Sequence, residues 1–255
     1  MVTYPQLRES ADRIAGFLRY KGVHTGDVAA IVMPRSIDYS VRDSGAKLII
    51  DEELFHKAIS FDAVPQNEPV SEQTPAIVFY TSGSTGRPKG VLHDQESIGE
   101  CIERLLELTQ LKNTDVIGAV APFEFAAHMN DTVRAMCSRA SCIVIPRDIV
   151  MDPNEMAEYI ERYRITHIYL PPKIAKLFHK KGNSLKHIYT GCEPVRQIAP
   201  DGYRLFNMYA MSEMNVVTAF EIDKAYDNTP FRQARALYDT GAYGKNGRTS
   251  AQLKR

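Results

Sequence analysis

The segment YTSGSTGRPKGVLH, from Tyr80 to His93, combines glycines, hydroxyl side chains and cations within a short stretch. It follows an apolar run, residues 76–79, that is typical of a buried strand. Gly83 and Gly86 allow the backbone to adopt positive φ and to direct its N–H groups toward one point. The hydroxyls add donors, and Lys89 adds a positive charge on a flexible stem. We therefore predict a loop that binds a polyphosphate.

The spacing of this loop excludes a Walker A motif, which needs Gly, four residues and then Gly-Lys-Ser/Thr. Counting from Gly83, the second glycine is due at Pro88, and Gly90 follows Lys89. The string instead resembles the phosphate loop of adenylate-forming enzymes. That family includes acyl-CoA synthetases, luciferases and the adenylation domains of nonribosomal peptide synthetases. The alternative is a surface turn rich in Gly and Ser, which a match of this length disfavours.

Bulk composition narrows the class of protein further. The chain has 255 residues, with 31 basic and 31 acidic side chains, so its formal net charge is zero. A neutral chain lacks the basic excess typical of nucleic-acid or anionic membrane partners. Apolar runs are shorter than the ~20 residues that span a bilayer, and the first residues do not resemble a signal peptide. We expect a cytoplasmic protein with no nucleic-acid or membrane partner and with its four cysteines reduced.

Hydrophobic periodicity predicts an α/β fold of mostly parallel sheets with flanking helices. Thr3 and Gln6 predict a capping box for a first helix that ends near Gly22. Further helices are predicted around residues 98–106, 127–138, 153–164 and 172–180. Strands are predicted at residues 28–33, 47–50, 76–79, 116–121, 142–145, 167–170, 185–190, 203–208 and 215–222.

The domain organisation follows from one polar stretch. Residues 61–74 are rich in Pro, Gln, Asn and Glu and predict a linker. We therefore expect an N-terminal αβ portion (1–62), an ATP-binding adenylation core (75–245) and a tail (246–255). The resemblance implies the large N-terminal domain of the adenylate-forming fold in truncated form. Family segments near residue 40 and near residue 230 have no counterpart here, and neither has the C-terminal domain that carries the catalytic lysine.

A second segment, LFNMYAMSE (residues 205–213), resembles the family signature Asn-x-Tyr-Gly-x-Thr-Glu. The resemblance implies that Tyr209 stacks on adenine, Ser212 contacts the α-phosphate and Glu213 binds Mg²⁺. These residue types suit those roles, because an aromatic face suits a purine and a carboxylate suits a hard cation. Gly191-Cys192-Glu193 resembles the Gly-Gly-Glu turn beside adenine. Cys192 has no histidine near it in the sequence, and we do not expect it to be a nucleophile.

The segment PFEFAAHMND (residues 122–131) resembles the family's substrate-pocket motif, Phe-x-Phe-Asp in members that activate amino acids. Its aspartate pairs with the substrate ammonium, and Ala126 occupies that position here. A buried ammonium without its counter-ion costs several kcal/mol. His128 is expected to be a helix-surface histidine. By position, the resemblance implies a substrate pocket lined by Ala126, Asn130, Met208, Val216 and Val217.

A further departure from the family lies near the C-terminus. Segment 237–245 resembles the family's Tyr-x-Thr-Gly-Asp motif, whose aspartate binds the ribose hydroxyls. Here that position is Ala242, and Asp239 lies three residues too early to replace it. The chain therefore combines a complete phosphate loop with alanine at two positions where the family has a carboxylate.

Together these motifs predict ATP-dependent activation of an amino or aryl acid as acyl-AMP, impaired by the missing segments. ATP and Mg²⁺ are the expected cofactors, and a carrier protein with a phosphopantetheine thiol is the expected macromolecular partner. A competent ligase for an acid without an α-amino group, and a degenerate scaffold that binds no nucleotide, stay open as alternatives. The expected catalytic residues are Lys89, Ser212 and Glu213, with Glu213 as the metal ligand. The expected ATP-binding residues are Thr81, Ser82, Gly83, Ser84, Thr85, Gly86, Lys89, Gly191, Tyr209 and Ser212.

Overall fold

The computed structural model of the chain describes residues 1–32, 44–64, 69–81, 88–178, 184–193, 195, 198–223 and 235–236. These residues form two compact units, one within residues 1–96 and one within residues 97–251. The predicted phosphate-loop residues Ser82, Gly83, Ser84, Thr85 and Gly86 lie outside the described residues, as do Asp239 and Ala242. Within the described part, no helix is both long enough and apolar enough to cross a bilayer.

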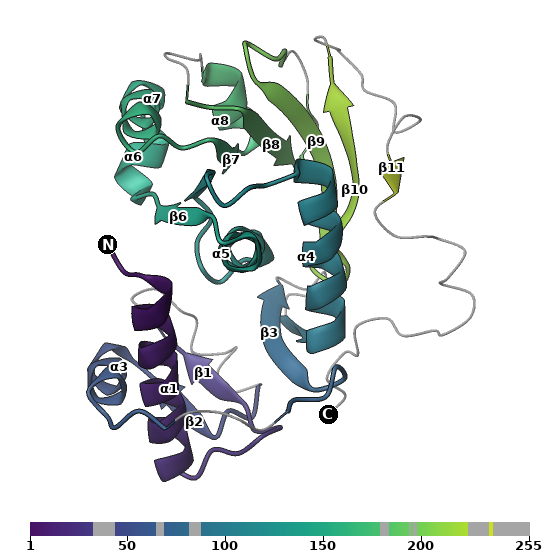
Figure 1. The fold of residues 1–255 in the computed structure, drawn as a ribbon. Coiled ribbons are helices and arrows are strands. Elements are labelled where there is room, and N and C mark those ends of the chain that lie inside the picture. Colours follow the sequence, from purple (N-terminus) through teal and green to yellow (C-terminus); the bar gives the residue numbers. More distant parts are fainter. Residues whose placement is uncertain are drawn as a thin grey trace. The chain divides into compact units, whose positions relative to one another are not determined.

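The first unit begins with helix α1 (Tyr4–Tyr20), and the predicted capping box is present at its start (Figure 1). The Thr3 side chain accepts a hydrogen bond from the Gln6 backbone N–H, and the Gln6 side chain accepts one from the Thr3 backbone. Helix α3 (Glu52–Ile59), which the periodicity did not predict, begins at the N-cap Asp51. Phe17 of α1 contacts Phe61 edge-on, with 5.7 Å between ring centroids.

Two small sheets complete this unit. Strand β1 (Ala29–Ile31) pairs in parallel with β2 (Leu48–Ile50), so β2 finds a direct partner despite the missing family segment. Strand β1 is shorter than the predicted buried strand 28–33, and Ile31 at its end is exposed. Strand β3 (Pro75–Thr81) pairs antiparallel with β4 (Lys89–Asp94), which the sequence did not predict. Of β3, only Phe79 is buried.

The second unit is built on a seven-stranded sheet in the order β11-β10-β9-β8-β7-β5-β6. Strands β5 to β9 run parallel to one another, whereas β10 is antiparallel to its neighbours β9 and β11. This confirms the predicted, mostly parallel sheet. The strands are β5 (Val116–Ala119), β6 (Ser141–Val144), β7 (His167–Tyr169), β8 (His187–Gly191), β9 (Arg204–Met211), β10 (Asn215–Ile222) and β11 (Arg235–Ala236).

Helices cover both faces of this sheet, and two hydrophobic clusters fill the space between the layers. On one face, Ile160 and Ala175 from the helices pack with Ile188 and Leu205 from the strands. On the other face, Leu105 of α4 packs against Tyr189, Phe206 and Met208, and Figure 1 shows α4 in front of strands β9 and β10. The helices are α4 (Gln95–Thr109), α5 (Ala126–Ser138), α6 (Arg147–Met151), α7 (Pro153–Arg162) and α8 (Pro172–Leu177).

Local signals explain where several of these helices begin. Asp152 caps α7 and accepts hydrogen bonds from the backbone N–H groups of Asn154 and Glu155. This is the predicted helix start with proline at the first position. Helix α6 is only five residues long and was not predicted, since so short a segment shows no periodicity.

Candidate functional site

The first group of predicted site residues lies on the hairpin β3–β4 in the first unit. Thr81 lies opposite Lys89 in the strand register, and the Thr81 hydroxyl donates to the Lys89 backbone carbonyl over 3.5 Å. Both residues therefore flank the predicted phosphate loop at its two ends. A strand follows the loop, whereas a Walker A loop leads into a helix. The structure thus agrees with the spacing argument against a P-loop.

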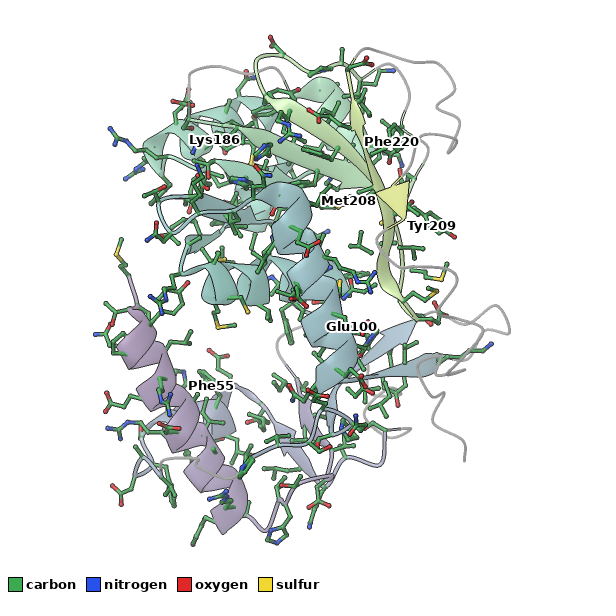
Figure 2. The ribbon with its side chains drawn as sticks, turned by 45° about the vertical axis from the view of Figure 1, so that its right-hand side comes forward. Phe55, Glu100, Lys186, Met208, Tyr209 and Phe220 are labelled. Atoms are coloured by element: carbon green, nitrogen blue, oxygen red, sulfur yellow. The ribbon has the colours of Figure 1, made fainter. Side chains whose placement is uncertain are left out.

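The second group of predicted residues lies at the carboxyl ends of the parallel strands β8 and β9. Gly191 pairs with Met208 in the strand register, and the Cys192 N–H donates to the Met208 carbonyl over 3.2 Å. Tyr209 is the next residue on β9, and its side chain is 41% exposed. Met208 and Tyr209 are marked in Figure 2. Ligands of open α/β sheets bind beyond the carboxyl ends of such strands. An exposed aromatic ring at this edge suits stacking on a purine.

Gly191 itself has a structural role that the sequence did not predict. Its φ is +146°, and a Cβ atom added there would overlap the Met208 carbonyl group. The Gly191 carbonyl accepts a hydrogen bond of 3.1 Å from the hydroxyl of Tyr169 on β7. Glycine therefore allows β8 and β9 to approach closely before the chain turns at Cys192, which has a φ of 62°.

Ser212 and Glu213 lie in the short turn that joins β9 to β10. The turn is closed by the Met214 N–H, which donates to the Met211 carbonyl over 3.2 Å. Ser212 is half-buried and Glu213 is exposed, so the carboxylate is available to solvent. A Mg²⁺ ion in a phosphate site commonly takes one or two carboxylates and completes its shell with phosphate and water. Among described residues no group of three metal ligands occurs, and a single exposed carboxylate fits a phosphate-bound Mg²⁺.

The predicted substrate-pocket residues come from helix α5 and from the hairpin β9–β10. Met208 and Val216 pack in the same buried cluster beneath α4. Ala126 is the first residue of α5 and is half-buried. Val217 lies at a β-bulge, where the register shifts between Val216 and Thr218. The bulge brings Val216 to the side of the sheet that carries Ala219 and Met208.

Asn130 of α5 joins these two elements. Its side chain forms a reciprocal pair of hydrogen bonds with Asn215, the first residue of β10. Asn130 was predicted from the sequence to line the pocket, whereas Asn215 was not. An asparagine directly after a turn is a signal for left-handed backbone, and Asn215 has a φ of 58°. Its side-chain partner is 85 residues away and has no local signature.

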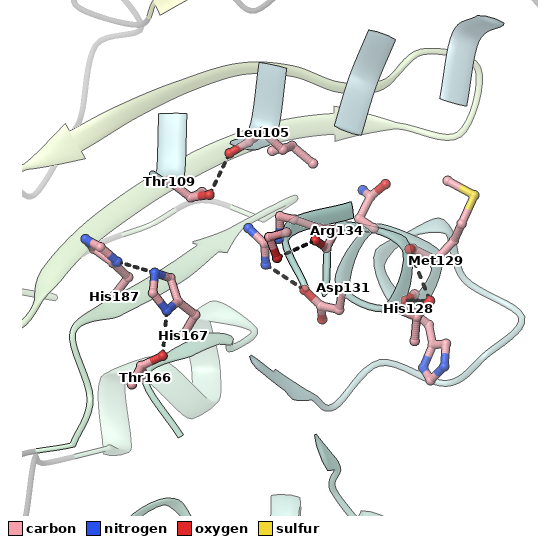
Figure 3. Close-up of polar contacts among 12 residues, drawn as sticks. Leu105, Thr109, His128, Met129, Asp131, Arg134, Thr166, His167 and His187 are labelled. Atoms are coloured by element: carbon pink, nitrogen blue, oxygen red, sulfur yellow. Dashed lines mark hydrogen bonds and ion pairs between the residues drawn. The ribbon is translucent and has the colours of Figure 1, made fainter. Parts of the chain in front are cut away.

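Next to Asn130, helix α5 presents a buried ion pair to the sheet. Arg134 Nη2 lies 2.9 Å from Asp131 Oδ1, and both side chains are almost fully buried. The Arg134 guanidinium also lies over the Tyr189 ring, 4.9 Å from its centroid. Burial raises the pKa of Asp131 to about 6, although the adjacent Arg134 opposes the rise. Figure 3 shows this pair on the side of α5 that faces His167 and His187.

His128 is not the surface histidine that the sequence predicted. Its ring Nδ1 lies 2.9 Å from the Ala121 carbonyl, and the side chain is half-buried. The ring is turned toward the preceding strand end because the intervening residues 122–125 bend back before α5 begins. His128 therefore anchors the segment that leads into the helix.

Comparisons with known proteins agree with this geometry. A family model described as AMP-binding enzyme matches residues 40–245, and the chain belongs to this family. Bacitracin synthase 3 of Bacillus licheniformis is 27% identical over 84% of this chain and 4% of its own length. A probable non-canonical nonribosomal peptide synthetase, CymA of Salinispora arenicola, is 25% identical over 85% of this chain and 3% of its own length. The chain thus spans only a few per cent of these relatives.

Solved structures show the same fold. The N-terminal subdomain of Klebsiella oxytoca NpsA, in complex with 3-hydroxyanthranilyl-AMSN, has a TM-score of 0.74 and 19% identity. The match covers 89% of this chain and 71% of that chain. ATP-bound MatB of Rhodopseudomonas palustris has a TM-score of 0.73 and 18% identity, over 93% of this chain and 59% of that one. The chain therefore has the α/β fold of the N-terminal subdomain of adenylate-forming enzymes.

Proposed function

We propose that this chain binds ATP and activates a carboxylic acid as its acyl adenylate, releasing pyrophosphate. The observation that carries the proposal is the register of β8 and β9. It sets Gly191 beside Met208, with Tyr209 and then the Ser212–Glu213 turn immediately beyond. Membership of the AMP-binding family and the fold of an ATP-bound relative support the same activity.

Each residue has a role that follows from its chemistry. The Tyr209 ring stacks on the adenine, and the Ser212 hydroxyl donates to the α-phosphate. Lys89 neutralises charge on the triphosphate, as an ammonium on a flexible stem can. Glu213 holds the Mg²⁺, which supplies the charge neutralisation that phosphoryl chemistry requires.

The substrate is proposed to be an acid without an α-amino group. Ala126 offers a methyl group where amino-acid-activating relatives have a carboxylate. The nearby Glu124 is exposed, and Asp131 is already paired with Arg134. A buried substrate ammonium would therefore lack a counter-ion at this end of α5. An aryl acid has no such requirement, and the thiol of a carrier protein is the proposed acceptor of the acyl group.

A second candidate is nucleotide binding without turnover. It is favoured by Ala126 and Ala242, which replace two carboxylates that the resemblance leads one to expect. The two candidates differ in one measurement, the exchange of labelled pyrophosphate into ATP in the presence of an acid. Exchange with a member of a panel of aryl and amino acids supports activation. Binding of ATP without exchange for any acid in the panel supports the second candidate.

Substitution of Lys89 tests ATP binding itself. Lys89→Ala is expected to remove most of the thermal stabilisation by Mg-ATP, because the triphosphate loses a full positive charge. Lys173→Ala, at an exposed position on α8, serves as the matched control and should keep the stabilisation. Differential scanning fluorimetry at millimolar Mg-ATP measures both. If the unmodified chain is not stabilised by Mg-ATP, the proposed function is wrong.

A further inference from the structure

The side chains of Asn130 and Asn215 form a closed amide pair between helix α5 and strand β10. Asn130 Nδ2 donates to Asn215 Oδ1 over 2.6 Å, and Asn215 Nδ2 donates to Asn130 Oδ1 over 3.0 Å. The two residues are 8% and 3% exposed, respectively. Buried amides of this kind are costly unless they are paired, because each group has lost its hydrogen bonds to water. The pair therefore fixes the distance between the two elements.

The backbone of Asn215 adds a second constraint at the same place. Its φ of 58° is in the left-handed region, which asparagine tolerates better than most residues. This conformation ends the turn of residues 212–214 and begins β10. The position of the turn thus depends on Asn215 in two ways, through its backbone and through its side-chain bonds to α5.

The pair is close in sequence to two groups of predicted site residues. Glu213 is two residues before Asn215, and Ser212 is three residues before it. On the other side, Asn130 is one helical turn after Ala126, at the end of α5 that carries the acyl-pocket positions. A displacement of about 1 Å in groups that orient reacting atoms can cost roughly 100-fold in rate. A rigid link at this point would keep the proposed metal-binding turn (residues 212–214) and helix α5 at a fixed position relative to each other.

We propose that Asn130 and Asn215 are a positioning pair, which holds the Ser212–Glu213 turn against helix α5 so that Glu213 is placed for the phosphate-bound metal. The pair acts through Glu213 and does not contact the nucleotide. This inference rests on the proposed function and adds the residues that orient its metal-binding turn.

The test separates the hydrogen bonds from the backbone conformation. Asn215→Gly keeps a residue that adopts positive φ freely and removes only the amide. Asn130→Ala removes the same bonds from the helix side and leaves Asn215 in place. The readout is the affinity for ATP, measured by calorimetry once with Mg²⁺ and once with EDTA, so no acid substrate is required. Glu213→Gln serves as the reference for loss of the metal ligand, and Asn113→Gly, in an exposed turn, is the matched control.

We expect the unmodified chain to bind ATP at least ten times more tightly with Mg²⁺ than with EDTA. In Asn215→Gly and in Asn130→Ala this gain, the increase in ATP affinity on adding Mg²⁺, should fall to about threefold or less. The affinity for ATP in EDTA should stay within about twofold of that of the unmodified chain. The double variant should lose no more than either single variant, since both remove one interaction. Asn113→Gly should behave as the unmodified chain does.

The possible failures point to different errors. If the unmodified chain binds no ATP, the proposed function is wrong and the inference is wrong with it. If the unmodified chain gains from Mg²⁺ and Glu213→Gln abolishes the gain, but both asparagine variants keep it, only the inference is wrong. A lowered melting temperature with the gain intact would show a merely structural pair. Retention of the gain in Glu213→Gln would also overturn the inference, because the pair would then position a residue that binds no metal.

Discussion

At the scale of single residues, Gly191 is a position that the fold restricts to glycine. Its positive φ and the approach of the Met208 carbonyl both exclude a side chain. Gly191→Ala should therefore lower the free energy of unfolding by more than about 2 kcal/mol. Urea denaturation followed by circular dichroism measures the change.

Gly99 provides the opposite case for the same substitution. It lies within helix α4, and a Cβ added there would meet no atom within 4 Å. Gly99→Ala should raise stability by about 0.5–1 kcal/mol, because alanine is the better helix former. An equal effect of the two substitutions would contradict the interpretation of Gly191.

Single residues also show what the sequence could and could not reveal. The capping box at Thr3 and Gln6 was predictable because both partners lie within one helical turn. Asn215, by contrast, looked like the first residue of a strand, and only the fold shows its partner Asn130. Asp131 and Arg134 have the spacing of an ordinary surface ion pair on a helix, so nothing in the sequence indicated that they are buried.

At the scale of elements, strands β7 and β8 carry two histidines in contact, of which His167 is buried and His187 is half-buried. His167 Nε2 lies 2.6 Å from His187 Nδ1, and His167 Nδ1 lies 2.8 Å from the Thr166 hydroxyl (Figure 3). Burial lowers the pKa of His167 to about 3 and that of His187 to about 4. For His167, proximity to His187, Arg134 and Lys186 lowers the pKa further, whereas Asp115 opposes this effect. For His187, Arg204 and Lys186 lower the pKa, and Asp115 and Glu221 raise it.

These shifts predict that the protein loses stability as the pH falls below about 6.5. The unfolded chain binds protons at His167 and His187 from that pH downward, whereas in the folded chain these two residues do not bind protons until near pH 4, so acid favours unfolding. At pH 5 the fully buried His167 alone accounts for about 2 kcal/mol. Asp131 works in the opposite direction, because its raised pKa lets the folded state take up a proton near pH 6, and it offsets roughly 1 kcal/mol.

Urea unfolding at pH 7.5 and at pH 5.0 measures the loss. His167→Asn should reduce the difference between the two pH values, and His56→Asn, at an exposed position on α3, should leave it unchanged. The same pH dependence in the unmodified chain and in His167→Asn would show that another group is responsible.

Elements differ in how well the sequence predicted them. Strand β10 was predicted with the bounds that the structure has, and α5 differs by one residue, since both have strong patterns and clear ends. Strand β4 was missed because its start, Lys89-Gly90, was interpreted as part of the phosphate loop. Strands β1 and β3 were predicted as buried, yet each lies in a two-stranded sheet, and Phe79 is the one buried residue of the two strands.

At the scale of the whole molecule, charge balance predicts the solution behaviour of the chain. The formal net charge is zero, and the sequence pI is about 7.1. A protein without net charge has little electrostatic repulsion between copies and associates more readily. We expect the solubility to be lowest near pH 7 and to be higher at pH 8.5. Light scattering across this pH range measures it, and equal scattering at all pH values would contradict the expectation.

The fold class was predictable from the sequence at this scale, because alternating strands and helices leave few arrangements other than a parallel sheet with covering helices. The assembly of the site is a different matter. Thr81 and Lys89 belong to one compact unit, and Tyr209, Ser212 and Glu213 belong to the other. The roles of both groups in ATP binding stay predictions that the binding experiments above address.

The bulge in β10 also affects how specificity can be inferred from related sequences. Val216 and Val217 together occupy the space of one residue in the strand pairing. The alternation of side chains between the two faces of the sheet therefore shifts by one residue at this point. In a homologue with an unbroken ladder, an alignment without gaps would assign inward-facing residues one position out of phase. When pocket residues on this strand are inferred from a homologue, the two sequences should therefore be aligned separately before and after the bulge.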